Sequence, residues 1–199
     1  TRDSQVNPAV TFSALITGNI DLLNFFVYML SQVMGAALGS LFVWLSDPDA
    51  RRNVAAYLGT FTINPEIGVA RGFFIETILT FILVIAIFGS AVMPQHVKKG
   101  SPIAEVPGLL AKIPIGFAVC ADILAGGLAT GACMNPARAL GPALVAWAWK
   151  ETSWIYFTAP FVGGALAGLL YQFVLTPRER STGLEERTPL IHRPEEGTA

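Results

Sequence analysis

The residues best suited to chemistry in this sequence are two copies of the tripeptide Asn-Pro-Ala, at residues 7–9 and 135–137. Asn is a favoured helix N-cap, and Pro suits the first helical position, where its missing N–H has no intrahelical partner to lose. Each copy therefore predicts the start of a helix with an Asn amide at its tip. The second copy continues into Arg138, a cation within an apolar segment. An arginine inside a membrane costs at least ~2.5 kcal/mol at a helix centre and is a functional candidate by default.

The segments that follow the two tripeptides are apolar but short. Residues 8–18 and 136–148 have only about half the length that a helix needs to cross a bilayer. Such pieces lie at membrane depth only when they are buried in protein or line a water-filled cavity. We therefore expect two re-entrant half-helices whose tips carry Asn7 and Asn135. Interfacial helices or short connectors are the alternative interpretation.

Four longer runs are apolar enough to span a bilayer. The chain has 199 residues, of which 53% are hydrophobic and only 14% charged, whereas a typical soluble domain has roughly 25% charged residues. The sequence thus predicts an all-α, multi-pass membrane protein. The expected spans are Phe25–Leu45, Gly72–Met93, Leu109–Leu128 and Trp154–Leu175.

Several classes of function are disfavoured. The net charge is −1, so the chain lacks the excess of positive charge that is typical of proteins that bind nucleic acids. His96 and His192 are isolated, and no metal, cofactor or catalytic-triad spacing occurs in the sequence. We therefore predict no enzymatic activity and no cofactor.

An internal repeat relates the two ends of the chain. The offset that aligns the tripeptides also aligns residues 28–41 with 156–169, and it pairs Gly35 with Gly163. Three full spans separate the two short helices, and an odd number of crossings inverts the second half relative to the first. Inverted repeats whose half-helix ends meet near the bilayer midplane are typical of membrane transporters.

The paired motifs, the second extended to NPAR, resemble those of the aquaporins, or major intrinsic proteins, over residues 5–176. Ile123 resembles the residue found at its position in the aquaporin-8 and plant tonoplast-intrinsic groups, and the stretches "ADILAGG" (121–127) and "GACMNPARALGPA" (131–143) look closest to aquaporin-8. The resemblance implies an aquaporin-like inverted repeat with four of the family's six transmembrane helices and two re-entrant half-helices. We expect residues 1–176 to form a channel domain that lacks the first two transmembrane helices.

The resemblance also assigns a pore. Asn7 and Asn135 would donate to one water molecule at its centre, and Pro8 and Pro136 would stack where the half-helices abut. Ala9 and Ala137 complete the two motifs. Ile123, Ala132 and Arg138 would belong to the selectivity filter, whose fourth position lies on the missing second span.

Further assignments concern the loop before the second motif. Gly131, Ala132 and Cys133 would present backbone carbonyls to a file of water molecules. Glu76 would be a structural buried acid that accepts hydrogen bonds from backbone amides of this loop, with a proton relay as the alternative. Cys133 is a candidate mercurial site or, equally, an inert buried thiol. Cys120 is expected to pack inside a span.

The function that the resemblance implies is passive water transport. With Ile123 in the filter, the channel would also pass ammonia or hydrogen peroxide. Protons and ions would be excluded by the opposed half-helix dipoles, the paired asparagines and Arg138. One alternative is a glycerol facilitator, which Ala139 disfavours because that branch usually has Asp there. Another is a truncated, non-conducting isoform that modifies the assembly of full-length subunits. The expected assembly is a homotetramer in a lipid bilayer.

Asp122 and the C-terminal tail complete the set of candidates. Asp122 is next to Ile123 in the sequence, and two roles are left open for it: anchoring the loop before the second motif, or lining the pore.

Residues 177–199 are polar and predicted to be a disordered cytoplasmic tail. Within the tail, "ERTPLI" resembles an acidic dileucine signal read by endosomal and lysosomal adaptors (Glu186, Leu190 and Ile191). The expected location is the plasma membrane or an endosomal, lysosomal or vacuolar membrane.

Overall fold

The computed structural model describes residues 5–53, 58–92 and 112–175. The predicted tail, with Glu186, Leu190 and Ile191, lies outside the described residues, and so does most of the loop at 94–112.

Within these ranges, four helices are long and apolar enough to cross a membrane, and they confirm the four predicted spans. They are α2 (Leu22–Ser46), α5 (Val69–Ile87), α7 (Ile113–Thr130) and α9 (Ile155–Leu170). Two of them continue into π-helical turns, α5 into η1 (Phe88–Val92) and α9 into η3 (Tyr171–Leu175). Helix α2 begins earlier than predicted because the Asp21 side chain caps it by accepting a hydrogen bond from the Asn24 amide at 2.8 Å.

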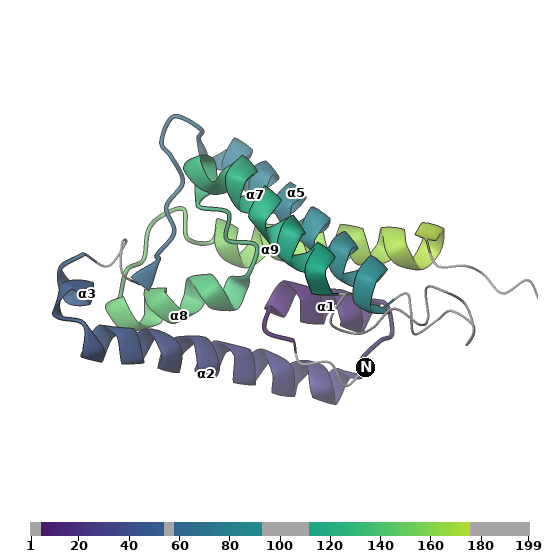
Figure 1. Cartoon of the computed structure of the whole chain (residues 1–199), viewed down its shortest axis with the longest axis horizontal. Coiled ribbons are helices and arrows are strands. Elements are labelled where there is room, and N and C mark those ends of the chain that lie inside the picture. Colours follow the sequence, from purple (N-terminus) through teal and green to yellow (C-terminus); the bar gives the residue numbers. More distant parts are fainter. Residues whose placement is uncertain (1–4, 54–57, 93–111, 176–199) are drawn as a thin grey trace, which may run out of the picture.

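Both tripeptides begin short helices, α1 (Pro8–Ile16) and α8 (Pro136–Ala146). Helix α8 ends two residues before the predicted end because Trp147 is left-handed, with φ of 51°. Figure 1 shows α1 and α8 end to end above α2, with their N-terminal ends at the centre of the molecule. With 9 and 11 residues at 1.5 Å each, the two together extend ~30 Å, about one hydrocarbon core.

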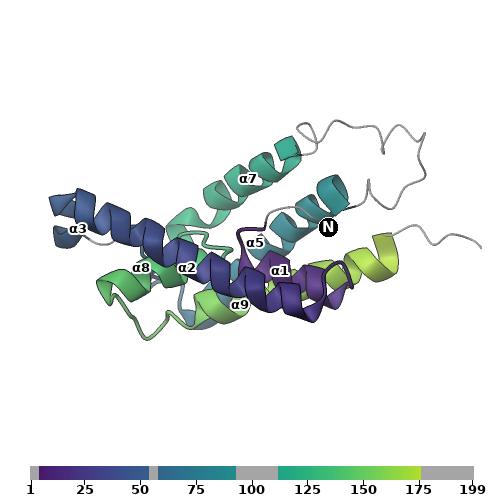
Figure 2. The same cartoon turned by 90° about the horizontal axis from the view of Figure 1, so that it is seen from below.

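Each half-helix packs on the long span of the opposite half of the chain: α1 on α9, and α8 on α2. At the first interface, Ser13 Oγ donates to the Gly164 carbonyl at 2.8 Å. At the second, a Cβ on Gly141 would lie 2.6 Å from the backbone of Ala36. The repeat offset relates Ser13 to Gly141 and Ala36 to Gly164, so equivalent positions are in contact at the two interfaces. Figure 2 shows the second interface from below, with α2 crossing α8.

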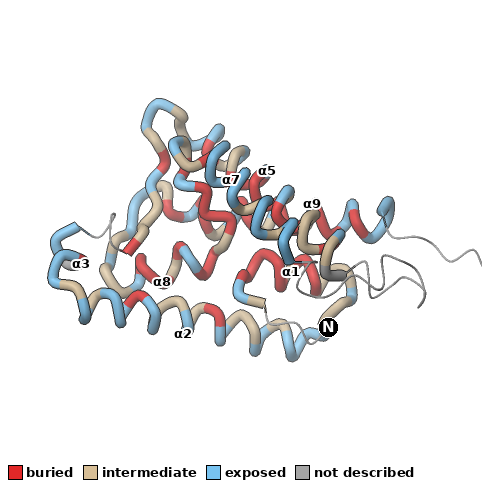
Figure 3. Tube along the Cα trace, in the orientation of Figure 1, coloured by how far each residue is buried: buried red, intermediate tan, exposed pale blue. Residues whose placement is uncertain are grey.

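Burial is concentrated around the half-helices and the loop that precedes α8. Figure 3 shows this inner region in red, while α2 and α7 are mostly exposed. Three buried clusters fill the inner region, and the one nearest the loop contains Leu79, Leu83, Ala132 and Met134. The core therefore surrounds the place where the two tripeptides meet.

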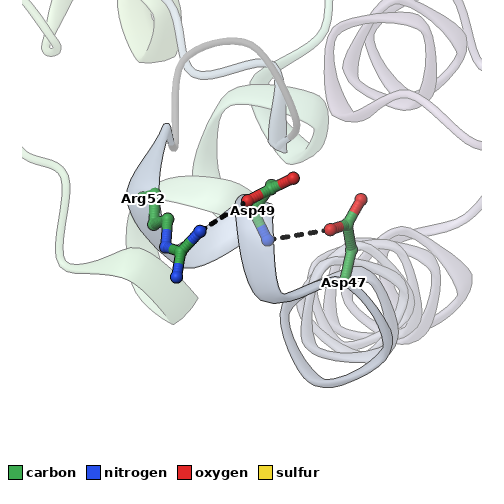
Figure 4. A network of polar contacts seen from close by, with 3 residues as sticks. All are labelled: Asp47, Asp49 and Arg52. Atoms are coloured by element: carbon green, nitrogen blue, oxygen red, sulfur yellow. Dashed lines mark hydrogen bonds and ion pairs between the residues drawn. The ribbon is translucent and has the colours of Figure 1, made fainter.

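The link after α2 is a separate, exposed polar turn. Helix α3 (Pro48–Arg52) begins at Asp47, whose carboxylate accepts from the Asp49 amide at 2.8 Å. Arg52 and Asp49 form an ion pair at 3.3 Å across the turn (Figure 4). Exposed pairs of this kind contribute about 0–1 kcal/mol, so α3 has little influence on the site.

Candidate pore site

The two asparagines cap their helices with nearly the same geometry. Asn7 has φ/ψ of −142°/115°, and Asn135 has −145°/107°. Each side-chain Oδ1 accepts from the amide two residues later, at 2.9 Å for Asn7 and 3.0 Å for Asn135. The oxygen of each amide is therefore committed to its own helix, and its NH₂ group faces away from that helix.

The NH₂ groups link the two halves reciprocally. Asn7 Nδ2 donates to the carbonyl of Met134 at 2.9 Å, and Asn135 Nδ2 donates to the carbonyl of Val6 at 2.9 Å. Each acceptor is the residue just before the other asparagine, so the pair of bonds repeats the internal symmetry of the chain. These bonds bring the two tips together although the asparagines are 128 positions apart in the sequence.

One hydrogen of each amide is left over by this arrangement. An Asn NH₂ group carries two donor hydrogens, and the cross-link uses one on each side. The second hydrogens lie where two helix N-termini meet, and each terminus carries about half a positive elementary charge. A neutral dipole that accepts hydrogen bonds is therefore favoured at this point, and a cation is disfavoured.

Glu76 on α5 holds the loop that leads into α8. Its side chain is fully buried. Oε1 accepts from the Cys133 amide at 2.9 Å and from Thr130 Oγ1 at 2.6 Å, while Oε2 accepts from the Met134 amide at 2.9 Å. These two amide groups precede α8 and have no helical partner, so Glu76 satisfies donors that would be costly to bury unpaired.

The loop backbone has unusual dihedral angles. Gly131, Ala132 and Met134 have φ of +87°, +49° and +54°, and a left-handed non-glycine residue costs on the order of 1–3 kcal/mol. With the amides turned toward Glu76, no described residue donates to the carbonyls of Gly131, Ala132 or Cys133. Ala132 and Cys133 are buried while Gly131 is exposed, so the role of these three carbonyls toward a file of water molecules stays a prediction.

A groove of about 800 Å³ runs along α2 past the tip of α8. Its lining includes Val6, Gln32, Asn135 and Arg138, but neither Ile123 nor Ala132. Of the three predicted filter residues, only Arg138 therefore faces this groove. Ala132 is buried in the cluster beside α5, and Ile123 on α7 is 49% exposed.

Other predicted residues have mixed outcomes. Cys133 is buried and its thiol donates to the Asn135 carbonyl at 3.2 Å, which favours the inert-thiol alternative. The expectation that Cys120 packs inside a span is wrong, because it is exposed. Asp122 is buried on α7 with Oδ2 unpaired among the described residues, and both loop anchoring and pore lining remain open for it.

Sequence reasoning missed three residues at the site. Thr130 bonds Glu76, and Tyr156 donates to the Thr130 carbonyl at 2.8 Å. The Phe61 ring lies under the Arg138 guanidinium, with 4.2 Å between the guanidinium carbon and the ring centroid. Phe61 belongs to the segment before α5, 77 positions from Arg138, and no spacing rule connects them.

This geometry defines a class of protein: a multi-pass membrane protein with inverted halves whose half-helix tips meet at one polar point. The model of the family described as "Major intrinsic protein" matches residues 4–171, and the chain belongs to this family. The family consists of membrane channels and not of enzymes.

Individual relatives agree with this assignment and confirm the predicted resemblance to tonoplast intrinsic proteins. The chain is 42% identical to the probable aquaporin TIP3-2 of Arabidopsis thaliana over 86% of its length and 59% of the relative. It is 41% identical to aquaporin TIP1-1 of the same plant, over 88% of the chain and 64% of the relative. The chain thus spans about 60% of the length of these relatives.

The fold has a solved counterpart in the X-ray structure of the aquaglyceroporin from Plasmodium falciparum. The TM-score is 0.66, with 23% sequence identity over 86% of this chain and 73% of that one. This likeness supports the aquaporin-like architecture.

Proposed function

We propose that this protein is a passive water channel that excludes protons and other cations where α1 and α8 meet. The observation that carries the proposal is the reciprocal pair of bonds from Asn7 and Asn135, both 2.9 Å long. They fix two amides side by side, and each keeps one hydrogen for a water molecule. The carbonyls of Gly131, Ala132 and Cys133, which accept from no described donor, would offer such water further acceptor sites.

Exclusion of ions follows from electrostatics. Two half-helix N-termini face the same point, and together they present about one positive elementary charge in a low-dielectric setting. Repulsion of protons and cations by the positive ends of half-helix dipoles is established for aquaporin-type pores. Arg138 adds a full positive charge in the groove beside them.

The solute range and the setting are also part of the proposal. Ile123 does not line the groove beside Arg138, so passage of ammonia and hydrogen peroxide as well as water is proposed on the resemblance to the tonoplast-intrinsic group alone. Names of the relatives indicate the tonoplast-intrinsic group, and we place the protein in a vacuolar-type membrane as a homotetramer. Recognition of the tail by endolysosomal adaptors remains a proposal.

Stopped-flow light scattering of vesicles that contain the purified chain tests the function. Water flux should be fast, with a low activation energy, and Arg138→Ala should change the ratio of water to ammonia permeability. Arg52→Ala, which removes an arginine from the exposed α3 turn, is the matched control and should leave the ratio unchanged. Glycerol uptake measured in parallel should stay at the level of protein-free vesicles. Water permeability equal to that of protein-free vesicles would refute the proposal.

A second candidate is an assembly partner of longer channel subunits, without conduction of its own. The observation in its favour is the exposed apolar face of α7, where Leu124 and Leu128 are 87% and 95% exposed. Large apolar faces of this kind bind lipid or another helix. Co-reconstitution with a full-length tonoplast-type channel separates the two: an assembly partner changes the flux of that channel while the chain alone conducts nothing.

A further inference from the structure

Three tryptophans lie close together where α8 ends and α9 begins, at positions 147, 149 and 154. Trp147 is 78% exposed, Trp149 38% and Trp154 48%. Figure 2 shows the link that carries them at the edge of the molecule, outside the two helices that it joins. This surface, which we call the tryptophan turn (residues 147–154), lies at the opposite end of α8 from Asn135 and has a separate role to explain.

Trp147 ends α8 in a backbone conformation that suits glycine. Its φ and ψ are 51° and 39°, in the left-handed region, where a side chain costs free energy that glycine avoids. In the first half of the chain, the left-handed residue that follows α1 is Gly18, with φ of 71°. The repeat offset pairs Trp147 with Asn19, so the internal symmetry does not account for an aromatic residue here. The chain thus keeps a strained and exposed tryptophan at a position where its backbone favours glycine.

The rings of the tryptophan turn support one another. Trp147 and Trp149 cross at 84°, with 6.2 Å between ring centroids, and Trp149 lies 6.0 Å from the ring of Phe157. Trp154 lies against Phe73 with 5.9 Å between centroids. The turn is therefore a preformed aromatic surface, anchored on α9 and α5.

The length of α8 places this surface at the edge of a bilayer. The tips of α1 and α8 meet, and the two half-helices together extend about one hydrocarbon core, so the tips lie near its middle. With 11 residues at 1.5 Å each, α8 extends ~16 Å from its tip, and half of the hydrocarbon core of a bilayer is ~15 Å. Figure 1 shows the exposed polar α3 turn at the same end of the molecule. The tryptophan turn therefore lies where acyl chains end and headgroups begin.

We propose that the tryptophan turn binds the headgroup layer of a phospholipid bilayer and thereby fixes the depth of α8 in the membrane. A tryptophan combines a large apolar ring with one N–H donor, which suits the boundary between acyl chains and headgroups. The ester carbonyls and phosphates of phospholipids accept from that N–H. Lys150, exposed between Trp149 and Glu151, can extend its ammonium group to the same phosphates. Because α8 carries Trp147 at one end and Asn135 at the other, lipid contact at the turn holds Asn135 near the bilayer centre.

The depth of the Trp147 ring is measured by fluorescence quenching, independently of transport. A variant whose only tryptophan is Trp147 (Trp44→Phe, Trp149→Phe and Trp154→Phe) is reconstituted in phosphatidylcholine that carries bromine either near the headgroup or near the ends of the acyl chains. Bromine near the headgroup should quench the emission more strongly. If the triple variant does not fold, the difference between the spectra of the wild type and Trp147→Phe gives the same comparison.

Three results of this measurement would overturn the proposal. Stronger or equal quenching by the deep bromines would place the ring among the acyl chains. Red-shifted emission that neither lipid quenches would place it in water. Blue-shifted emission that neither lipid quenches would show that protein, such as a second copy of this chain, covers the ring.

The stabilising effect of the lipid contact is separated from packing by Trp147→Gly. Glycine relieves the strained backbone and so offsets the lost ring contact, and this variant should melt close to the wild type in a maltoside detergent, which has no phosphate or ester group. In phosphatidylcholine nanodiscs, its melting temperature should rise less than that of the wild type. Phe117→Leu, at a 70% exposed ring on α7 outside the turn, is the matched control and should rise as much as the wild type. An equal rise in Trp147→Gly would overturn the proposal, and so would the same loss of stability in both media, which would make Trp147 a packing residue.

Discussion

Substitution of Glu76 by Gln tests the most heavily bonded side chain of the site. The two backbone amides of Cys133 and Met134 bind different carboxyl oxygens, each at 2.9 Å. A glutamine keeps one acceptor oxygen and places an NH₂ group at the other position. One buried amide then loses its acceptor and faces a donor, while the strained loop that it belongs to loses a restraint.

The expected cost follows from these contacts. A hydrogen bond to a charged group contributes about 1.5–3 kcal/mol, and a buried donor left unsatisfied costs about 1–3 kcal/mol. These figures overlap because they describe the same broken bond, so we expect the free energy of unfolding to fall by about 2–4 kcal/mol. This is a substantial share of a typical total of about 5–15 kcal/mol.

The assay is SDS-driven unfolding in mixed micelles, followed by tryptophan fluorescence. Glu66→Gln is the matched control, since it makes the same chemical change at an exposed residue, and it should shift the free energy of unfolding by less than about 0.5 kcal/mol. Local loosening should also increase the reaction rate of the buried Cys133 thiol in Glu76→Gln. Equal stability of the two variants, with no change in thiol reactivity, would refute the argument that Glu76 holds the loop.

Three further outcomes are expected. Gly141→Ala should lower the free energy of unfolding by about 1–3 kcal/mol in the same assay, because the added Cβ would lie 2.6 Å from the α2 backbone. Gly116→Ala is the control and should have no such effect, since there is open space around Gly116. Equal effects of the two substitutions would contradict the contact between α8 and α2. The hydrogen bond from the Asn24 amide lowers the pKa of Asp21 below its ordinary value of 3.8. The ionised Asp21 carboxylate therefore stabilises the fold fully at a pH above 3.8, and this stabilisation is lost as the pH falls through the lower pKa of the folded state. Thermal unfolding should therefore show a smaller loss of stability in acid for Asp21→Asn than for the wild type, and parallel pH curves would contradict this. Maleimide in detergent should label exposed Cys120 much faster than buried Cys133, and equal rates by mass spectrometry would show that the loop opens readily.

The sequence alone was sufficient for the local elements of this fold. Length and apolar composition identify the four spans, because a bilayer of fixed thickness demands about 20 apolar residues whatever the neighbours are. The Asn-Pro pairs at 7–8 and 135–136 mark both half-helix starts, since capping depends on residues within one turn. The three spans between the two short helices, an odd number, further predict that the two halves are related by inversion.

Only the tertiary structure decided which faces of these helices meet. Membrane-spanning helices are apolar on all sides, because lipid and protein interior are alike to them, so the sequence pattern does not indicate that α1 packs on α9 or α8 on α2. The partners of Glu76 and the placement of Arg138 over Phe61 depend on chain segments that are more than 50 positions apart. Such contacts arise when the helices dock, and neither hydropathy nor capping preference encodes them.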